Sequence, residues 1–169
     1  IISLSTYTVN ITEFVVLTQF GRPVSTIEKP GLKFKLPPPI QKVNRFDKRL
    51  QLYESRLVEL LTKDKKNVVL KFFVVWRIEE PMLFFQAVGD IAMAELKLDD
   101  ILISKCGAAL GDYEFEDLIS IEREVKLSQL EEKIKNELEK QASRDYGMLI
   151  SEVGISRFAL PESNAWSVY

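Results

Sequence analysis

The strongest constraint on the fold is a strictly alternating run in the first half of the chain. From residue 68 to residue 78, every second side chain is large and apolar, namely Val68, Leu70, Phe72, Val74, Trp76 and Ile78. The intervening positions carry Lys71 and Arg77 among further apolar residues. Because side chains alternate between the two faces of a strand, this pattern predicts an interior strand with one wholly apolar face against a core.

The residues before this strand also have the patterns of strands. Tyr7 to Ile11 alternate between apolar and polar side chains, and Phe14 to Leu17 form a second apolar run. Residues 40–61 alternate loosely and predict two more strands. Thr62 to Lys66 are polar and predict the turn that leads into the alternating strand.

After Pro81 the period changes from two residues to nearly four. We expect a short helix over Met82–Val88 and a longer one over Ile91–Leu110, with Asp90 as its N-cap and Gly111 as its stop.

The strongest helical pattern covers residues 122–146 and ends at Gly147. Its expected buried stripe consists of Ile121, Val125, Leu130, Ile134, Leu138, Ala142 and Tyr146. Met148 to Phe158 then predict a final strand, and the tail from Glu162 to Tyr169 has the pattern of another helix start.

This order of elements predicts an α+β fold. It divides the chain into a β-rich lobe with mainly antiparallel strands over residues 1–80 and an α/β lobe over residues 81–169. The second lobe would contain the long amphipathic helix and the closing strand.

Composition argues against several classes of function. The chain has no histidine, which removes the commonest general base and metal ligand, and its net charge of −2 gives no global reason to expect nucleic acid binding. Cys106 is the only cysteine and is expected to be a small buried apolar residue. Adjacent acidic residues such as Glu131 and Glu132 do not face each other on a helix. We therefore predict no catalytic residues, no cofactor and no metal.

The segment from Lys33 to Ile40 is the one stretch for which we prefer a functional interpretation. Its apolar members are the candidate membrane-contact residues Phe34, Leu36, Pro37, Pro38, Pro39 and Ile40. Lys33, Lys35 and Lys42 are placed to meet anionic headgroups. The plain structural alternative is an edge strand that the prolines terminate.

Several motifs along the chain occur in an order that resembles one known family. They are VNITEFVVLTQFGR (9–22), PGLKFKLP (30–37), Asp47 with Arg49, Thr62–Lys66, Trp76–Ile78, and Leu160–Pro161 with Tyr169. Together they resemble band 7 proteins, also called SPFH or prohibitin-homology proteins, and among them the bacterial HflC type. One departure is Gly107, because an Arg usually stands there in the family, which puts any contact made by that Arg in doubt.

The resemblance implies a non-enzymatic scaffold with its β-rich lobe nearest a membrane. It further implies a single N-terminal membrane span before residue 1, a coiled coil after Tyr169, and a location on the extracytoplasmic side if the chain is HflC-like. The implied partners are membrane lipids, further copies or a sister HflK-like subunit, and a membrane-bound ATP-dependent protease. Since the chain begins without Met, we expect a fragment. Because the fragment would lack the anchor and the coiled coil that are expected to drive assembly, we expect it to be monomeric or weakly associating by itself.

Two other classes of function remain open from the sequence. The chain is alternatively a stomatin- or prohibitin-like organiser of membrane microdomains, or a monomeric lipid-binding module. An enzyme ranks third, and a deep pocket with converging carboxylates would favour it.

Overall fold

The computed structural model describes residues 6–160, in which strands occupy most of the first half and helices most of the second. The strands are β1 (Thr6–Val9), β2 (Glu13–Gln19), β3 (Arg22–Ile27), β4 (Gly31–Phe34), β5 (Gln41–Asp47), β6 (Gln51–Glu54), β7 (Val58–Leu61), β8 (Asn67–Ile78) and β9 (Met148–Ala159). The helices are α1 (Pro81–Ala87), α2 (Ile91–Leu110), α3 (Phe115–Ile119) and α4 (Arg123–Tyr146). The predicted α+β class is confirmed, whereas the predicted tail helix after Glu162 lies outside the described residues.

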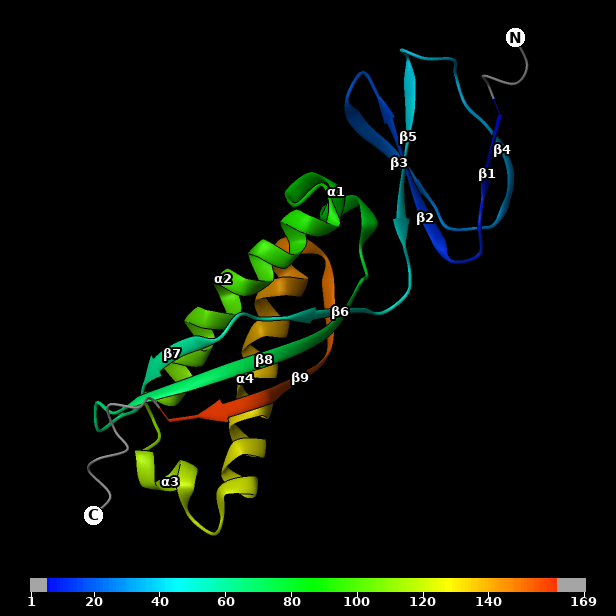
Figure 1. Cartoon of the computed structure of the whole chain (residues 1–169). Helices are drawn as coiled ribbons and strands as arrows, with labels where there is room; N and C mark the ends of the chain where they lie inside the picture. Colours follow the sequence, from blue (N-terminus) through cyan, green and yellow to red (C-terminus); the bar gives the residue numbers. More distant parts are fainter. Residues whose placement is uncertain (1–5, 161–169) are drawn as a thin grey trace.

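A small lobe formed by β1 to β5 projects from a larger lobe that contains all four helices of the described residues (Figure 1). In the small lobe, β2 pairs antiparallel with β3 and with β5, and β1 pairs antiparallel with β4. The Ile11 position was predicted wrongly, because the chain already turns after Val9, where the Glu13 N–H donates to the Asn10 carbonyl (3.2 Å). Residues 40–61 hold three strands rather than the two expected.

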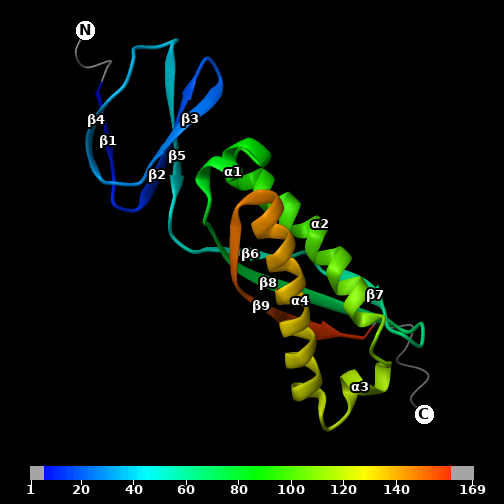
Figure 2. The same ribbon diagram turned by 180° about the vertical axis from the view of Figure 1, so that it is seen from behind.

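The large lobe is built around β8, which lies between β6 and β7 on one side and β9 on the other. All of these pairings are antiparallel, so β6, β7 and β8, which precede residue 80, share their sheet with the last strand of the described chain. The sheet lies in front of α2 and α4 in Figure 1 and behind them in Figure 2, so both helices cover one face. On that face the alternating β8 side chains from Val68 to Ile78 are buried, which confirms the predicted interior strand.

The ends of the long helices follow from local chemistry. The Asp90 carboxylate accepts a hydrogen bond from the Met93 N–H (2.8 Å), as an N-cap should, and α2 ends at Gly111 as predicted. Gly147 ends α4 with φ of +65°, in the left-handed region that favours glycine.

The predicted buried stripe of α4 is correct only in part. Leu130, Ile134 and Leu138 are fully buried, whereas Val125 and Ile121 are exposed. Leu130 lies five positions after Val125, and five steps rotate a helix by about 500°, which leaves Val125 about 140° away from Leu130. Ile121 precedes the helix altogether.

The two lobes meet at a cluster of aromatic rings. Phe46 of β5 packs edge-on against Phe84 and Phe85 of α1, with ring centroids 5.5 Å and 6.2 Å apart. Lys48 follows β5, and its N–H donates to the Thr12 carbonyl at 2.8 Å. Phe46 thus extends the core of the large lobe into the small one.

Candidate functional site

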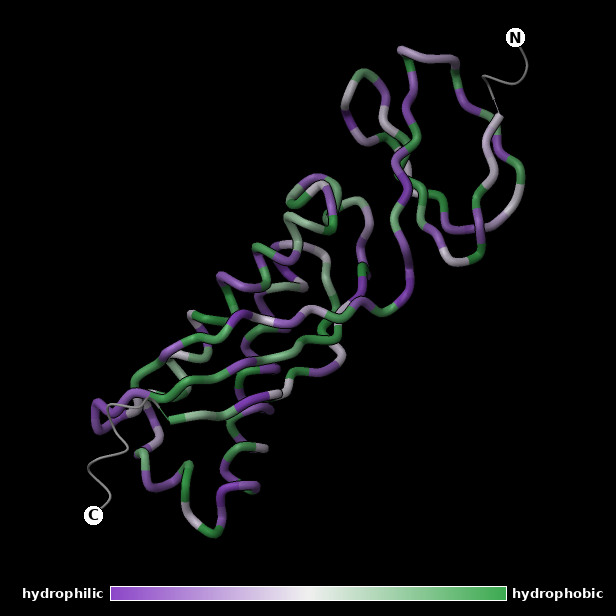
Figure 3. Tube along the Cα trace, in the orientation of Figure 1, coloured by the Kyte–Doolittle hydropathy of each residue, from purple (hydrophilic) through white to green (hydrophobic). Residues whose placement is uncertain are grey.

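The strand β4 carries its apolar side chains on the outside of the small lobe. Leu32 and Phe34 are 64% and 76% exposed, and they lie opposite Thr8 and Thr6 of β1. On the other face of the same ribbon, Tyr7 is buried, and burial raises the pKa of its hydroxyl. The apolar side chains of β4 therefore face away from the core. Figure 3 shows apolar and polar residues interleaved along the strands of the small lobe.

The proline segment that follows β4 folds into a loop held by three hydrogen bonds. The Ile40 N–H donates to the Pro37 carbonyl at 3.1 Å, and the Leu36 N–H donates to the Gln41 side-chain oxygen at 2.8 Å. The Ile40 carbonyl in turn accepts from the N–H of Phe20 at 3.1 Å. These bonds join the loop to the turn between β2 and β3.

The loop and the turn lie together at the end of the small lobe where β1 begins, away from the large lobe (Figures 1 and 2). We call this end the apolar tip. Its members are Phe20, Phe34, Leu36, Pro37, Pro38, Pro39 and Ile40, all of them exposed except the half-buried Ile40. The structure thus brings all six predicted candidate residues to one end of the molecule and adds Phe20.

Phe20 was not among the residues selected from the sequence. It occupies, with Gly21, a two-residue hairpin turn in which Gln19 pairs with Arg22, and both turn residues have positive φ. Asn or Gly ordinarily fills the first position of such a turn. A phenylalanine directly before a glycine between two strand patterns was the sequence signal for an unusual turn.

Basic side chains surround the tip. Arg22 lies beside the turn, Lys35 separates Phe34 from Leu36, and Lys42 is exposed one residue into β5. None of these three cations has a carboxylate partner within residues 6–160. The third predicted lysine, Lys33, lies opposite Tyr7 and is only partly exposed.

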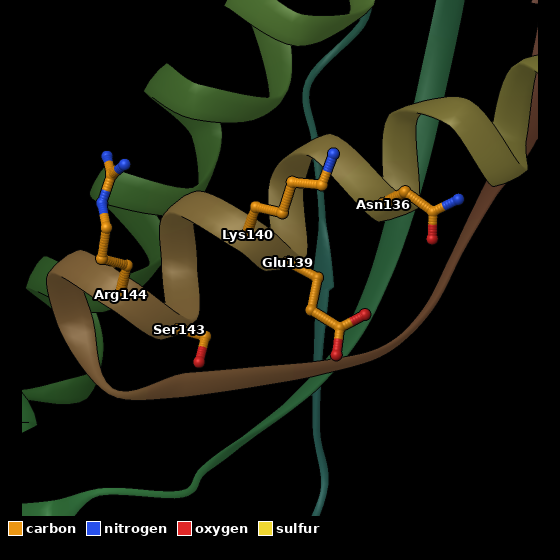
Figure 4. Close-up of a pocket in the computed structure, with 5 residues that line it drawn as sticks. All are labelled: Asn136, Glu139, Lys140, Ser143 and Arg144. Carbon is orange, nitrogen blue, oxygen red and sulfur yellow. The ribbon is translucent and has the colours of Figure 1, made fainter.

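A hollow of about 540 Å³ on the outer surface of α4 offers no catalytic arrangement (Figure 4). Its lining residues are Asn136, Glu139, Lys140, Ser143 and Arg144. All five come from one helix, and Figure 4 shows Glu139 and Lys140 pointing in opposite directions. Side chains that diverge in this way do not converge on a substrate.

A second hollow, of about 250 Å³, lies between α2 and α4 and contains ion pairs. Lys133 pairs with Asp112 and lowers the pKa of that carboxyl, and a hydrogen bond from Lys140 lowers the pKa of Glu137. Carboxyls with lowered pKa values are ionised at neutral pH and are poor proton donors. The groove therefore lacks the raised-pKa carboxyl that an acid catalyst needs.

Within residues 6–160, the lone cysteine and the acidic side chains form no further candidate site. Cys106 is buried on α2, as predicted, and burial raises the pKa of its thiol. Residues 6–160 contain no cluster of three or more His, Cys, Asp or Glu side chains placed to hold a metal ion. Among the helices of the same residues, none combines the length and the apolar character needed to cross a bilayer.

Comparison with known proteins gives consistent matches. The family model described as SPFH domain / Band 7 family matches residues 7–168. Protein HflC of Vibrio cholerae is 25% identical over 191 aligned residues, which cover 91% of this chain and 57% of that protein. The protein named Modulator of FtsH protease HflC, of Escherichia coli, is 28% identical over 99 residues, covering 57% of this chain and 29% of its own length. The chain thus spans little more than half of the first relative and less of the second.

Proposed function

The chain belongs to the SPFH domain / Band 7 family, and on that basis we propose that it is a non-enzymatic, membrane-associated scaffold of the HflC type. In this proposal it assembles with further copies or with a sister HflK-like subunit and modulates a membrane-bound ATP-dependent protease. Support for the last point comes from the Escherichia coli relative, whose name describes a modulator of FtsH protease.

The observation that carries the membrane part of the proposal is the outward apolar face of β4 and its proline loop. Phe34 and Leu36 are 76% and 47% exposed, although the alternating apolar side chains of β8 are buried. An exposed apolar cluster of this kind marks an interaction surface, for a membrane or for another protein. The prolines Pro37 to Pro39 have no N–H to desolvate, which lowers the cost of entering a headgroup layer.

The geometry favours shallow contact over insertion across the bilayer. The tip is formed by a loop and a hairpin turn, and a loop of this length reaches only the interface between headgroups and acyl chains. We propose that the small lobe is the membrane-proximal part of the domain and that the large lobe is held away from the bilayer.

Vesicle flotation of the 169-residue chain tests this proposal. The variant Phe34→Ser combined with Ile40→Ser is expected to lower the vesicle-bound fraction at least about tenfold, because two apolar side chains lose contact with lipid. Ile11→Ser combined with Leu57→Ser serves as the control, since both side chains are exposed but lie outside the tip. Equal binding of wild type and tip variant, with both still folded, would rule out the tip as the contact surface.

A further inference from the structure

The backbone of Phe20 adopts an unfavourable conformation, and its largely exposed ring makes few contacts within the protein that would offset the cost. It is 74% exposed, and its φ of +49° lies in the left-handed region that non-glycine residues avoid. Among the described residues only Lys65 shares this property, and it lies in the polar turn before β8. A bulky aromatic ring in such a conformation, with little contact to its own core, points to a role outside the fold.

The backbone of Phe20 places the ring in the apolar tip. Its N–H donates to the Ile40 carbonyl at 3.1 Å. This bond holds the hairpin turn beside the proline loop, so both face the same partner of the tip. The positive φ keeps the hairpin tight, because only two residues separate Gln19 from Arg22. The ring is therefore held at the end of a short, stiff hairpin.

Two of the tip's cations flank β2 at adjacent positions of its register. Arg22 pairs with Gln19, which also pairs with Gln41, and Lys42 pairs with the preceding residue, Thr18. With Lys35 they form what we call the basic rim. In the sequence no acidic residue occurs between Glu28 and Asp47, so this end of the lobe presents cations without a counter-charge nearby in the chain.

Building on the proposed membrane contact, we propose that Phe20 is a second anchoring residue of the tip and that the basic rim makes the tip select anionic phospholipid headgroups. Apolar side chains surrounded by unpaired cations match the interface of an anionic bilayer, where acyl chains lie directly below phosphate and carboxylate groups. An aromatic ring is well suited to this depth.

A substitution that separates folding from binding tests the role of Phe20. Phe20→Asn places a residue that tolerates positive φ in the turn, so we expect the melting temperature to rise by about 1–3 °C. The same variant is expected to bind phosphatidylglycerol-containing vesicles about tenfold less well. Ile11→Asn, in the turn between β1 and β2, is the matched control, because Ile11 is 76% exposed and should leave binding unchanged.

Vesicle composition and salt test the basic rim. Wild type should bind vesicles of phosphatidylcholine with 30% phosphatidylglycerol more tightly than vesicles of phosphatidylcholine alone, and 0.5 M salt should abolish the difference. Arg22→Gln, Lys35→Gln and Lys42→Gln should each weaken binding to the anionic vesicles about fivefold. Lys29→Gln, between β3 and β4, is the control with equal change in charge.

The outcomes separate this inference from the membrane proposal on which it rests. If Phe34→Ser with Ile40→Ser lowers binding while Phe20→Asn does not, the tip contacts lipid but Phe20 is no anchor. Equal binding to neutral and anionic vesicles overturns the role of the rim. Absence of vesicle binding by folded wild type, with a protein captured at the tip instead, overturns the membrane proposal and this inference together.

Discussion

At the scale of single residues, the clearest prediction concerns the stability effect of alanine at two glycines, Gly147 and Gly107, whose surroundings differ. At Gly147 an added Cβ would lie 2.7 Å from the Glu80 carbonyl oxygen, and φ is already positive. Gly147→Ala should therefore destabilise the protein by about 2–4 kcal/mol, from backbone strain and overpacking together. Urea denaturation measures this change.

Gly107 is the matched comparison within the helices. A Cβ there would meet Leu60 at 3.9 Å, an ordinary contact, so Gly107→Ala should stabilise α2 by about 0.5–1 kcal/mol. A destabilising Gly107→Ala, or a neutral Gly147→Ala, would contradict this reading of the two sites.

At the scale of elements, Asp64 ties the turn before β8 to α3. Its carboxylate accepts from the Thr62 hydroxyl at 2.6 Å and from the Phe115 N–H at 3.0 Å, and the Thr62 hydrogen bond is the main reason that its pKa is lowered. A lowered folded-state pKa contributes stability above the ordinary carboxyl pKa, and this contribution is lost as the pH falls through the folded value.

Asp64→Asn should therefore lower the melting temperature at pH 7, and the gap to wild type should narrow as the pH falls below about 4. Asp100→Asn, on the exposed side of α2, should leave the melting temperature unchanged at both pH values. A gap for Asp64→Asn that stays constant down to pH 2 would show that the carboxylate charge is not what holds the turn.

The elements that the sequence predicted well are those specified by a clear local pattern. The alternation in β8, the Asp90 cap and the Gly147 stop each follow from chemistry within a few residues. Val125 was assigned wrongly because its five-residue step to Leu130 breaks the helical period. The sequence pattern could not predict which way the apolar side of β4 faces, because a two-residue alternation is identical whether that side faces inward or outward.

At the scale of the whole molecule, stability depends on how the two lobes are joined. Phe46 is buried between them, so Phe46→Ala should cost about 3–5 kcal/mol and weaken the contact of the small lobe with α1. Phe73→Ala, on the face of the sheet opposite the helices, removes a partly buried ring and should cost less. Urea denaturation of both variants, with small-angle scattering for the separation of the lobes, provides the test. Equal costs would show that the ring cluster does not couple the lobes.

The pairing of strands within the small lobe explains why only part of the apolar tip could be predicted from the sequence. Residues 34–40 were recognisable as an apolar, proline-rich run, and they do lie together. Phe20 joins them through one backbone hydrogen bond across 20 positions, from its N–H to the Ile40 carbonyl. A contact of that kind depends on how β2 and β5 pair, which local patterns do not encode.

The outward apolar face of β4 also separates the cellular fates of two kinds of variant. A polar side chain at Leu32 or Phe34 removes little buried area, so the unfolded population barely changes and proteases that clear misfolded chains gain no extra substrate. A polar side chain at Phe72 raises that population and lowers abundance. Variants of β4 should therefore persist at normal levels while failing in their contacts, and such copies would compete with the wild type for its partners.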